Sequence, residues 1–120
     1  MSQTRSTYRA VQAVLSSRTR GLVGAAELER TKPTARLINA SRGPIVEEHA
    51  LISVLKNKQI AGAAIDVFDS EPLPPPHPFR TLDYVLATPH IGYASHGLYK
   101  TFYEETVSNI RRWIDPIRHP

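Results

Sequence analysis

The sequence predicts an α/β protein, in which helices flank a parallel sheet and a long helix closes the C-terminal end. Short apolar runs typical of buried strands alternate along the chain with segments whose apolar residues repeat at helical spacing. Such alternation indicates βα units and therefore a parallel sheet. The chain has 120 residues, of which 41% are hydrophobic and 22% are charged. This length and composition fit one globular domain or a part of one.

The first half of the chain contains two predicted helices and one clear strand. Residues 8–15 are ambiguous between strand and helix. A short helix is predicted over residues 24–30, and a strand over residues 35–39, an apolar run that follows Pro33. Residues 47–58 predict a helix, because their apolar side chains fall on one stripe. Glutamates begin this segment and lysines end it, as the helix dipole favours.

The second half adds two strands, a loop and a long helix. Residues 61–68 predict a buried strand whose small residues favour a closely packed helix over it. Residues 71–78 hold five of the ten prolines and predict an extended loop, because proline cannot donate to a sheet. A third strand is predicted over residues 84–88. A helix is predicted over residues 95–114, where apolar residues recur every three or four positions.

The composition excludes several classes of function. The chain has no cysteine, which rules out disulfide scaffolds, thiolate zinc sites, iron–sulfur clusters and cysteine nucleophiles. No metal site is predicted. No apolar stretch reaches the length of a membrane helix, so no membrane partner is expected. A chain without cysteine fits a reducing compartment, and a cytoplasmic location is expected.

The positive net charge of +4 arises at the N-terminal end. Residues 1–20 contain four arginines and no acidic residue. A transit peptide, a phosphate-binding face and an ordinary solvated terminus all fit this composition. Nucleic-acid binding is not expected, because Tyr8 is the single aromatic residue among these arginines and no binding motif is present.

Charged side chains follow all three predicted strands. An arginine follows residues 35–39, one carboxylate lies near the end of the second strand and another follows it, and a histidine follows the third strand; they are Arg42, Asp66, Glu71 and His90. In a parallel sheet the carboxyl ends of the strands share one edge, where ligands bind. We therefore expect these four residues to converge.

Together these residue types predict a site for a small anionic substrate that exchanges a proton. An imidazole passes protons near neutral pH, and a carboxylate bonded to it fixes its tautomer. An arginine offers a rigid fork of donors to a substrate carboxylate. Each residue also admits a structural interpretation: Arg42 as a turn cap, Asp66 as a loop cap, and Glu71 and His90 as ordinary loop residues.

Three motifs carry a family resemblance. They are NASRGPIV at residues 39–46, AIDVF at 64–68 with Glu71-Pro72, and TPHIG at 88–92. In order and spacing they resemble the D-isomer-specific 2-hydroxyacid dehydrogenases. The resemblance extends over about residues 6–117. It implies that residues 1–117 are the second half of a Rossmann-like NAD-binding domain, with residues 95–114 as its closing helix.

The resemblance also implies roles for individual residues. Arg42 would hold the carboxylate and carbonyl of the substrate, His90 would be the general acid/base, and Glu71 its carboxylate partner. Asp66 would accept a hydrogen bond from the nicotinamide amide. The cofactor, NAD or NADP, would also be lined by Ala40, Ser41, Arg42, His90 and Gly92. The implied reaction is hydride transfer between the cofactor and carbon 2 of a small 2-hydroxy or 2-keto acid, with His90 protonating the carbonyl oxygen.

The sequence departs from the family pattern in two ways. None of its six glycines forms G-x-G-x-x-G, and no acidic residue stands where the family reads the adenosine ribose. No segment corresponds to a substrate domain. We therefore expect a dehydrogenase fragment that binds NAD weakly and is inactive alone, and that pairs with a complementing chain or forms a homodimer. The alternative is a non-catalytic remnant or interaction module of the same fold.

Overall fold

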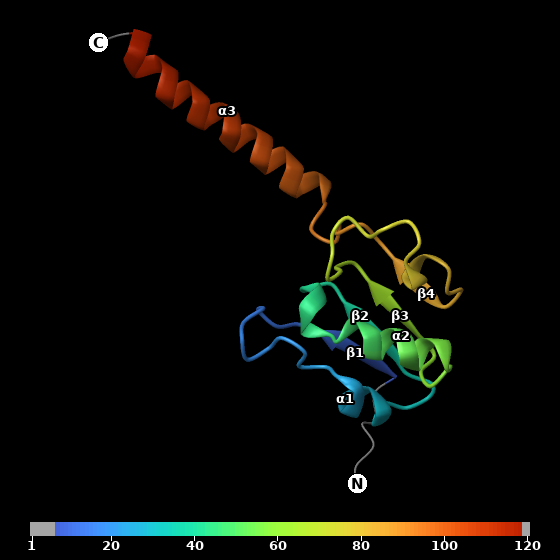
Figure 1. The fold of residues 1–120 in the computed structure, drawn as a ribbon. Helices are drawn as coiled ribbons and strands as arrows, with labels where there is room; N and C mark the ends of the chain where they lie inside the picture. The colour runs from blue at the N-terminus through green and yellow to red at the C-terminus, as the bar shows by residue number, and fades with distance from the viewer. Residues whose placement is uncertain (1–6, 119–120) are drawn as a thin grey trace.

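A computed structural model describes residues 7–118 and contains one sheet of four parallel strands. The strands lie in the order of the sequence (Figure 1): β1 (Tyr8–Val11), β2 (Arg36–Asn39), β3 (Gly62–Ile65) and β4 (Val85–Ala87). The register pairs the last residue of each strand with the last residue of its neighbour. The carboxyl ends therefore form one level edge, and the predicted α/β fold with a parallel sheet is confirmed.

The ambiguous segment at residues 8–15 is a strand over Tyr8–Val11 and then leaves the sheet. The transit-peptide interpretation of residues 1–20 falls partly on residues 1–6, which lie outside the described residues. The predicted strand at residues 61–68 is shorter than expected, because the chain leaves the ladder after Ile65. The proline-rich loop ends in a single 3₁₀ turn, η2 (Pro78–Arg80).

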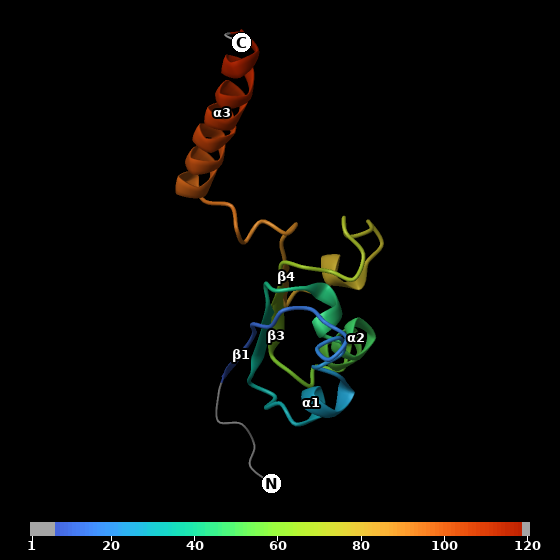
Figure 2. The same cartoon turned by 90° about the vertical axis from the view of Figure 1, so that its left-hand side faces the viewer.

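Two helices cover one face of the sheet. They are α1 (Ala25–Glu29) and α2 (Glu48–Lys56), and Figure 2 shows both on the same side of the strands. A 3₁₀ turn, η1 (Gly43–Ile45), leads from β2 toward α2. The core lies between this face and the helices, and its most deeply buried side chains include Leu28, Leu51, Leu55 and Ile65. The predicted apolar stripe of α2 therefore faces the sheet.

The third helix, α3 (His96–Arg118), is longer than predicted and projects away from the rest of the molecule (Figures 1 and 2). The molecule is consequently 70 Å long but only 32 Å and 25 Å across. We call residues 7–92, without this helix, the sheet body. Within the described residues, no helix is long and apolar enough to cross a membrane.

Candidate active site

The turn after β2 is built around a buried asparagine. Asn39 is 2% exposed, and its side chain donates to the carbonyl of Arg42 and accepts from the amide of Ser41. The Ser41 hydroxyl donates to the carbonyl of Val11, at 2.8 Å, and so ties the end of β2 to the end of β1. This bonding fixes the backbone that presents Ala40 and Arg42 to solvent at the sheet edge.

A glycine brings this turn against the segment that follows β3. A Cβ atom on Gly43 would lie 2.2 Å from the carbonyl carbon of Phe68, which no side chain tolerates. The turn carrying Arg42 therefore lies beside the segment that leads to Glu71. The Arg42 guanidinium donates to the carbonyl of Ser41 at 2.6 Å. Its charge also acts on Glu71, as described below.

Asp66 joins the end of β3 to the turn after β4. One carboxylate oxygen accepts from the Thr88 hydroxyl and from the Ile91 amide, and the other accepts from the Gly92 amide at 2.8 Å. A Cβ atom on Gly92 would lie 2.9 Å from the nearer oxygen, so glycine permits this contact. Burial raises the pKa of the Asp66 carboxyl, but the hydrogen bonds outweigh it and hold the pKa below its ordinary value.

Glu71 and His90 form a hydrogen-bonded pair at the same edge. Glu71 Oε2 lies 2.8 Å from Nδ1 of His90, and its other oxygen accepts from the Phe68 amide at 3.0 Å. The bond from His90, the bond from Phe68 and the charge of Arg42 all hold the pKa of the Glu71 carboxyl below its ordinary value. Glu71 is therefore ionised near neutral pH.

The ionised Glu71 sets the protonation of the histidine ring. A carboxylate can only accept hydrogen bonds, so Nδ1 of His90 carries the hydrogen. Nε2 makes no hydrogen bond to the described residues. The backbone of His90 is left-handed, with φ at 55°, a conformation that costs a residue other than glycine about 1–2 kcal/mol. The ring of Tyr93 stands edge-on to that of His90, with ring centroids 6.2 Å apart.

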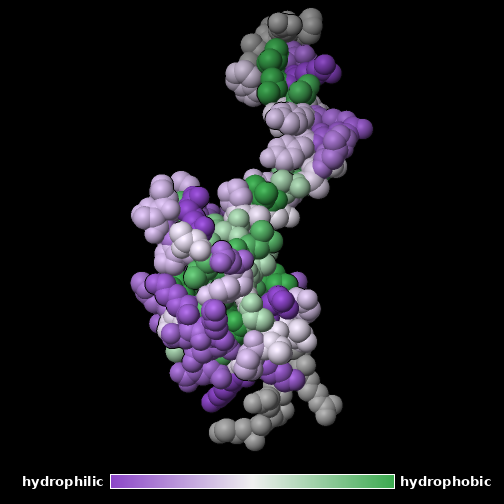
Figure 3. Space-filling model, turned by 90° about the vertical axis from the view of Figure 1, so that its right-hand side faces the viewer, coloured by the Kyte–Doolittle hydropathy of each residue, from purple (hydrophilic) through white to green (hydrophobic). Residues whose placement is uncertain are grey.

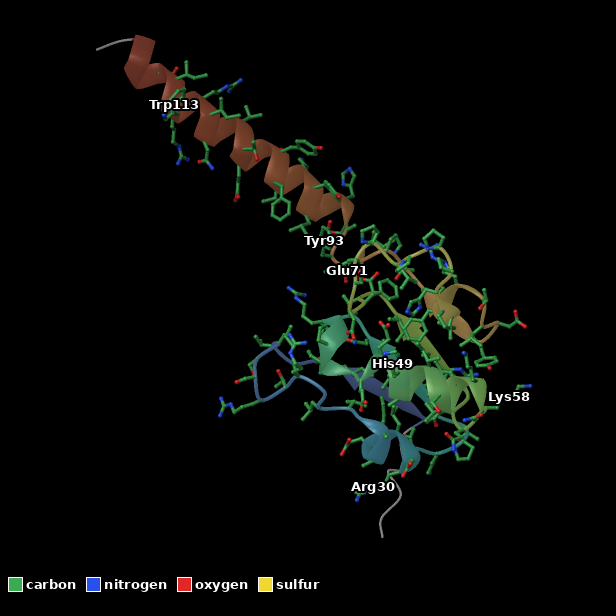
Figure 4. All side chains as sticks on the ribbon, viewed as in Figure 1. Arg30, His49, Lys58, Glu71, Tyr93 and Trp113 are labelled. Carbon is green, nitrogen blue, oxygen red and sulfur yellow. The ribbon has the colours of Figure 1, made fainter. Side chains whose placement is uncertain are left out.

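The Glu71–His90 pair lines a cleft of about 470 Å³. Apolar side chains from β4, η2 and the proline-rich loop form most of its wall; they include Leu73, Phe79, Val85 and Leu86. Arg42 lies outside this wall. In Figure 4, Glu71 and Tyr93 lie together at the end of the sheet body from which α3 departs.

A second histidine–glutamate pair fastens the proline-rich loop to α2. Nε2 of His77 lies 2.9 Å from Oε1 of Glu48, and Nδ1 of His77 accepts from the Phe79 amide. The guanidinium of Arg80 also donates to the carbonyls of Leu73 and Pro74. These contacts hold the loop that carries Glu71.

The structure thus places all four predicted charged residues at the carboxyl edge of one sheet. It joins Glu71 to His90 directly, and Asp66 to the turn that follows His90. The sequence analysis did not predict that Asn39 and Thr88 hold the site in place through their side-chain hydrogen bonds. An asparagine at a strand end is nevertheless a common signal for a turn that its side chain stabilises. Within residues 7–118, no cluster of three or more His, Asp or Glu side chains could hold a metal ion.

The chain is similar to a known protein family in sequence. Residues 4–92 match the family model of the D-isomer specific 2-hydroxyacid dehydrogenase, NAD binding domain. Glyoxylate/hydroxypyruvate reductase B of Enterobacter agglomerans is 42% identical over 105 residues, which are 88% of this chain and 32% of that protein. The chain therefore spans about a third of this relative.

Two solved structures are similar in fold and sequence. A D-isomer specific 2-hydroxyacid dehydrogenase from Xanthobacter autotrophicus Py2, in complex with NADPH and MES, matches with a TM-score of 0.69 and 44% identity, over 72% of this chain and 27% of that one. A phosphoglycerate oxidoreductase from Vibrio cholerae matches with a TM-score of 0.82 and 30% identity, over 95% of this chain and 36% of that one. The chain belongs to the D-isomer specific 2-hydroxyacid dehydrogenase family, within its NAD-binding domain.

Proposed function

We propose that this chain is the acid/base part of an NAD- or NADP-dependent 2-hydroxyacid dehydrogenase. The reaction is hydride transfer between the nicotinamide and carbon 2 of a small 2-hydroxy or 2-keto acid. The observation that carries this proposal is the Glu71–His90 pair. Its bonding leaves Nε2 of a half-exposed imidazole available at the sheet edge where ligands of parallel α/β proteins bind.

His90 is the group that exchanges the proton. Its Nδ1 is bonded to Glu71, so Nε2 gives a proton to the carbonyl oxygen during reduction and takes one from the hydroxyl during oxidation. Glu71 stays ionised, fixes the tautomer and stabilises the imidazolium that the oxidation direction forms. The proton therefore moves at Nε2 and the carboxylate keeps its charge.

Arg42 is proposed to bind the substrate carboxylate. It is exposed at the end of the neighbouring strand, and its backbone is held by the buried Asn39. A guanidinium pairs with a carboxylate through two parallel hydrogen bonds, which orients as well as binds. Its position beside Glu71 also places the anionic substrate near the imidazole.

The nicotinamide end of the cofactor fits the residues of this edge. Oδ2 of Asp66 accepts one hydrogen bond, from Gly92, and a carboxylate oxygen has a second lone pair for the nicotinamide amide. Ala40, Ser41 and Arg42, on the turn after β2, would line the cofactor with His90 and Gly92. When bound, the cofactor supplies or accepts the hydride.

The remaining assignments complete the proposal. Residues 1–117 are the second half of a Rossmann-like NAD-binding domain, and residues 95–114 belong to its closing helix. The residues that grip the substrate side chain lie outside this segment, and the partner that we propose is a complementing chain or a second copy. The protein works in the cytoplasm, in keeping with its lack of cysteine.

A chimaera tests this function. The matching third of the Enterobacter agglomerans reductase is replaced by this chain, and NADPH- or NADH-dependent reduction of glyoxylate and hydroxypyruvate is measured. We expect activity, and His90→Asn is expected to lower kcat by about 10²–10⁴-fold. The matched control is His49→Asn, at an exposed position of α2, which is expected to retain kcat. A folded chimaera without activity, or one in which His90→Asn matches His49→Asn, would contradict the proposal.

A further inference from the structure

The carboxylate that orients His90 is carried by a loop that contains no helix or strand. The loop runs from Asp66, after β3, to His77, before η2. On the side of the cleft it lies beside mostly apolar side chains, and Figure 3 shows hydrophobic surface in the middle of the sheet body, bordered by hydrophilic residues. Apolar contacts have no direction, so they do not by themselves fix where Glu71 meets His90.

Glu48 bonds this loop on both sides of Glu71, through its two carboxylate oxygens. Oε1 lies 2.9 Å from Nε2 of His77, and Oε2 accepts from the amide of Asp69 at 3.4 Å. Glu48 is the first residue of α2, and α2 is anchored in the core by buried side chains such as Leu51. The loop is therefore tied at two points to an element that packs on the sheet.

His77 fixes one of these points through both of its ring nitrogens. Nδ1 accepts from the amide of Phe79 at 3.2 Å, so Nε2 carries the hydrogen and donates to Glu48. The imidazole also packs against the Phe79 ring, with centroids 4.9 Å apart, and Phe79 is 3% exposed. We call the Glu48–His77 pair, with the bonds it makes to the loop, the loop clamp.

Contacts continue from the loop clamp to the Glu71–His90 pair. The ring of Phe79 packs against that of Phe68, with centroids 6.3 Å apart, and the amide of Phe68 donates to Oε1 of Glu71 at 3.0 Å. The residue that follows Phe68 donates its own amide to Glu48. The clamp thus holds the stretch of backbone that bonds one oxygen of Glu71, while the other oxygen meets Nδ1 of His90.

We propose that the loop clamp is a positioning device for the reaction, which places the Glu71 carboxylate against Nδ1 of His90. This inference rests on the proposed function. Glu48 and His77 are positioning residues, because they act on the proton transfer through Glu71. A displacement of about 1 Å in a group that orients a reacting residue can cost about 10²-fold in rate, and contacts of this kind prevent it.

Two substitutions open the loop clamp in different ways. Glu48→Ala removes both bonds to the loop. His77→Asn removes the contact with Glu48, because asparagine is shorter, but its side-chain oxygen can still accept from the Phe79 amide at the start of η2, as N-cap residues do. His77→Asn therefore separates the clamp from the folding of the turn. The matched controls are Glu47→Ala and His49→Asn, which change exposed neighbours of Glu48.

The first measurement is NMR spectroscopy on the full 120-residue chain, which needs no activity. The bonds from His90 and Phe68 hold the pKa of the Glu71 carboxyl below its ordinary value. In both clamp variants we expect this pKa to rise toward 4.5, and part of the His90 rings to carry hydrogen on Nε2 instead of Nδ1. The controls should change neither. A variant that only lost stability would keep both properties in its folded molecules.

The second measurement is the kinetics of the chimaera. Opening the clamp is expected to lower kcat about 10–100-fold. The KM for the keto acid should be nearly unchanged, because the turn of Arg42 is held separately by Asn39. Glu48→Gln keeps an oxygen for Nε2 of His77 and should retain most of kcat. The double variant Glu48→Ala/His77→Asn should be no slower than Glu48→Ala alone, since both changes break the same contact.

The proposal would be overturned by clamp variants that keep the His90 tautomer and the Glu71 pKa of the unaltered chain. Clamp variants with the kcat of the unaltered chimaera, or controls that change as much as they do, would overturn it too. His77→Asn decides alone if Glu48→Ala does not fold. An inactive unaltered chimaera would instead contradict the proposed function, so the two failures are distinguishable.

Discussion

The sheet body contains two histidine–glutamate pairs that are alike in contact and different in setting. The pairs are Glu48–His77, at 2.9 Å, and Glu71–His90, at 2.8 Å. In the first, the histidine and glutamate side chains are 13% and 18% exposed; in the second they are 36% and 37% exposed. Both ring nitrogens of His77 are bonded, whereas only one of His90 is.

This difference separates a structural pair from the pair that we propose to be reactive. His77 joins the proline-rich loop to α2 and has no ring nitrogen left for a substrate. His90 is oriented through Nδ1 and keeps Nε2 available for the proton transfer that we propose. The same two residue types thus stabilise the fold in one place and, in our proposal, carry the chemistry in the other. What differs is whether the protein bonds both nitrogens of the histidine ring or only one.

The largest expected difference between the pairs is in stability. His77→Ala leaves a half-buried Glu48 carboxylate without its partner, and should lower the free energy of unfolding by about 1–3 kcal/mol. His90→Ala removes an exposed contact, and should cost less than about 1 kcal/mol. Urea denaturation of the two variants measures both. Equal losses would show that the pairs do not differ in the way their burial indicates.

A smaller effect is expected from backbone strain. His90 and Lys58 are the residues other than glycine with positive φ in the described chain, at 55° and 53°. Lys58→Gly should raise the free energy of unfolding by about 0.5–1 kcal/mol, because glycine adopts this conformation without a clash. His90→Gly gains the same relief but loses the contact with Glu71, so its net change should be smaller. Thermal unfolding compares them, and a larger gain for His90→Gly would mean that the contact contributes nothing.

The smallest expected effect is the pH dependence that Glu71 gives to the free energy of unfolding. Because folding lowers the pKa of this carboxyl from its ordinary 4.5, its contribution to stability is fully present above that pH. The contribution is lost as the pH falls through the folded pKa. Glu71→Gln should remove this part of the acid dependence. Urea denaturation between neutral pH and pH 3 measures it, and curves that run parallel for both proteins would contradict the role of His90 in holding the carboxylate.

Alternation of strands and helices was enough to predict the parallel sheet and the edge to which Arg42, Asp66, Glu71 and His90 belong, since parallel topology alone decides that placement. The second pair could not be predicted, because Glu48 and His77 are 29 residues apart and meet only through the folded loop. The hydrogen bonds that the amides of Ile91 and Gly92 donate to Asp66 could not be predicted for the same reason. Residues 8–15 stayed ambiguous because β1 lies at the sheet edge and buries little.

The tautomers of the two histidines test the central distinction most directly. Long-range ¹H–¹⁵N NMR on the labelled chain, at a pH where both rings are neutral, identifies the protonated nitrogen of each. We expect opposite tautomers: hydrogen on Nδ1 of His90, which donates to Glu71, and on Nε2 of His77, which donates to Glu48. Hydrogen on Nε2 of both rings would contradict the account, because His90 would then hold no acceptor for the proton of a substrate hydroxyl.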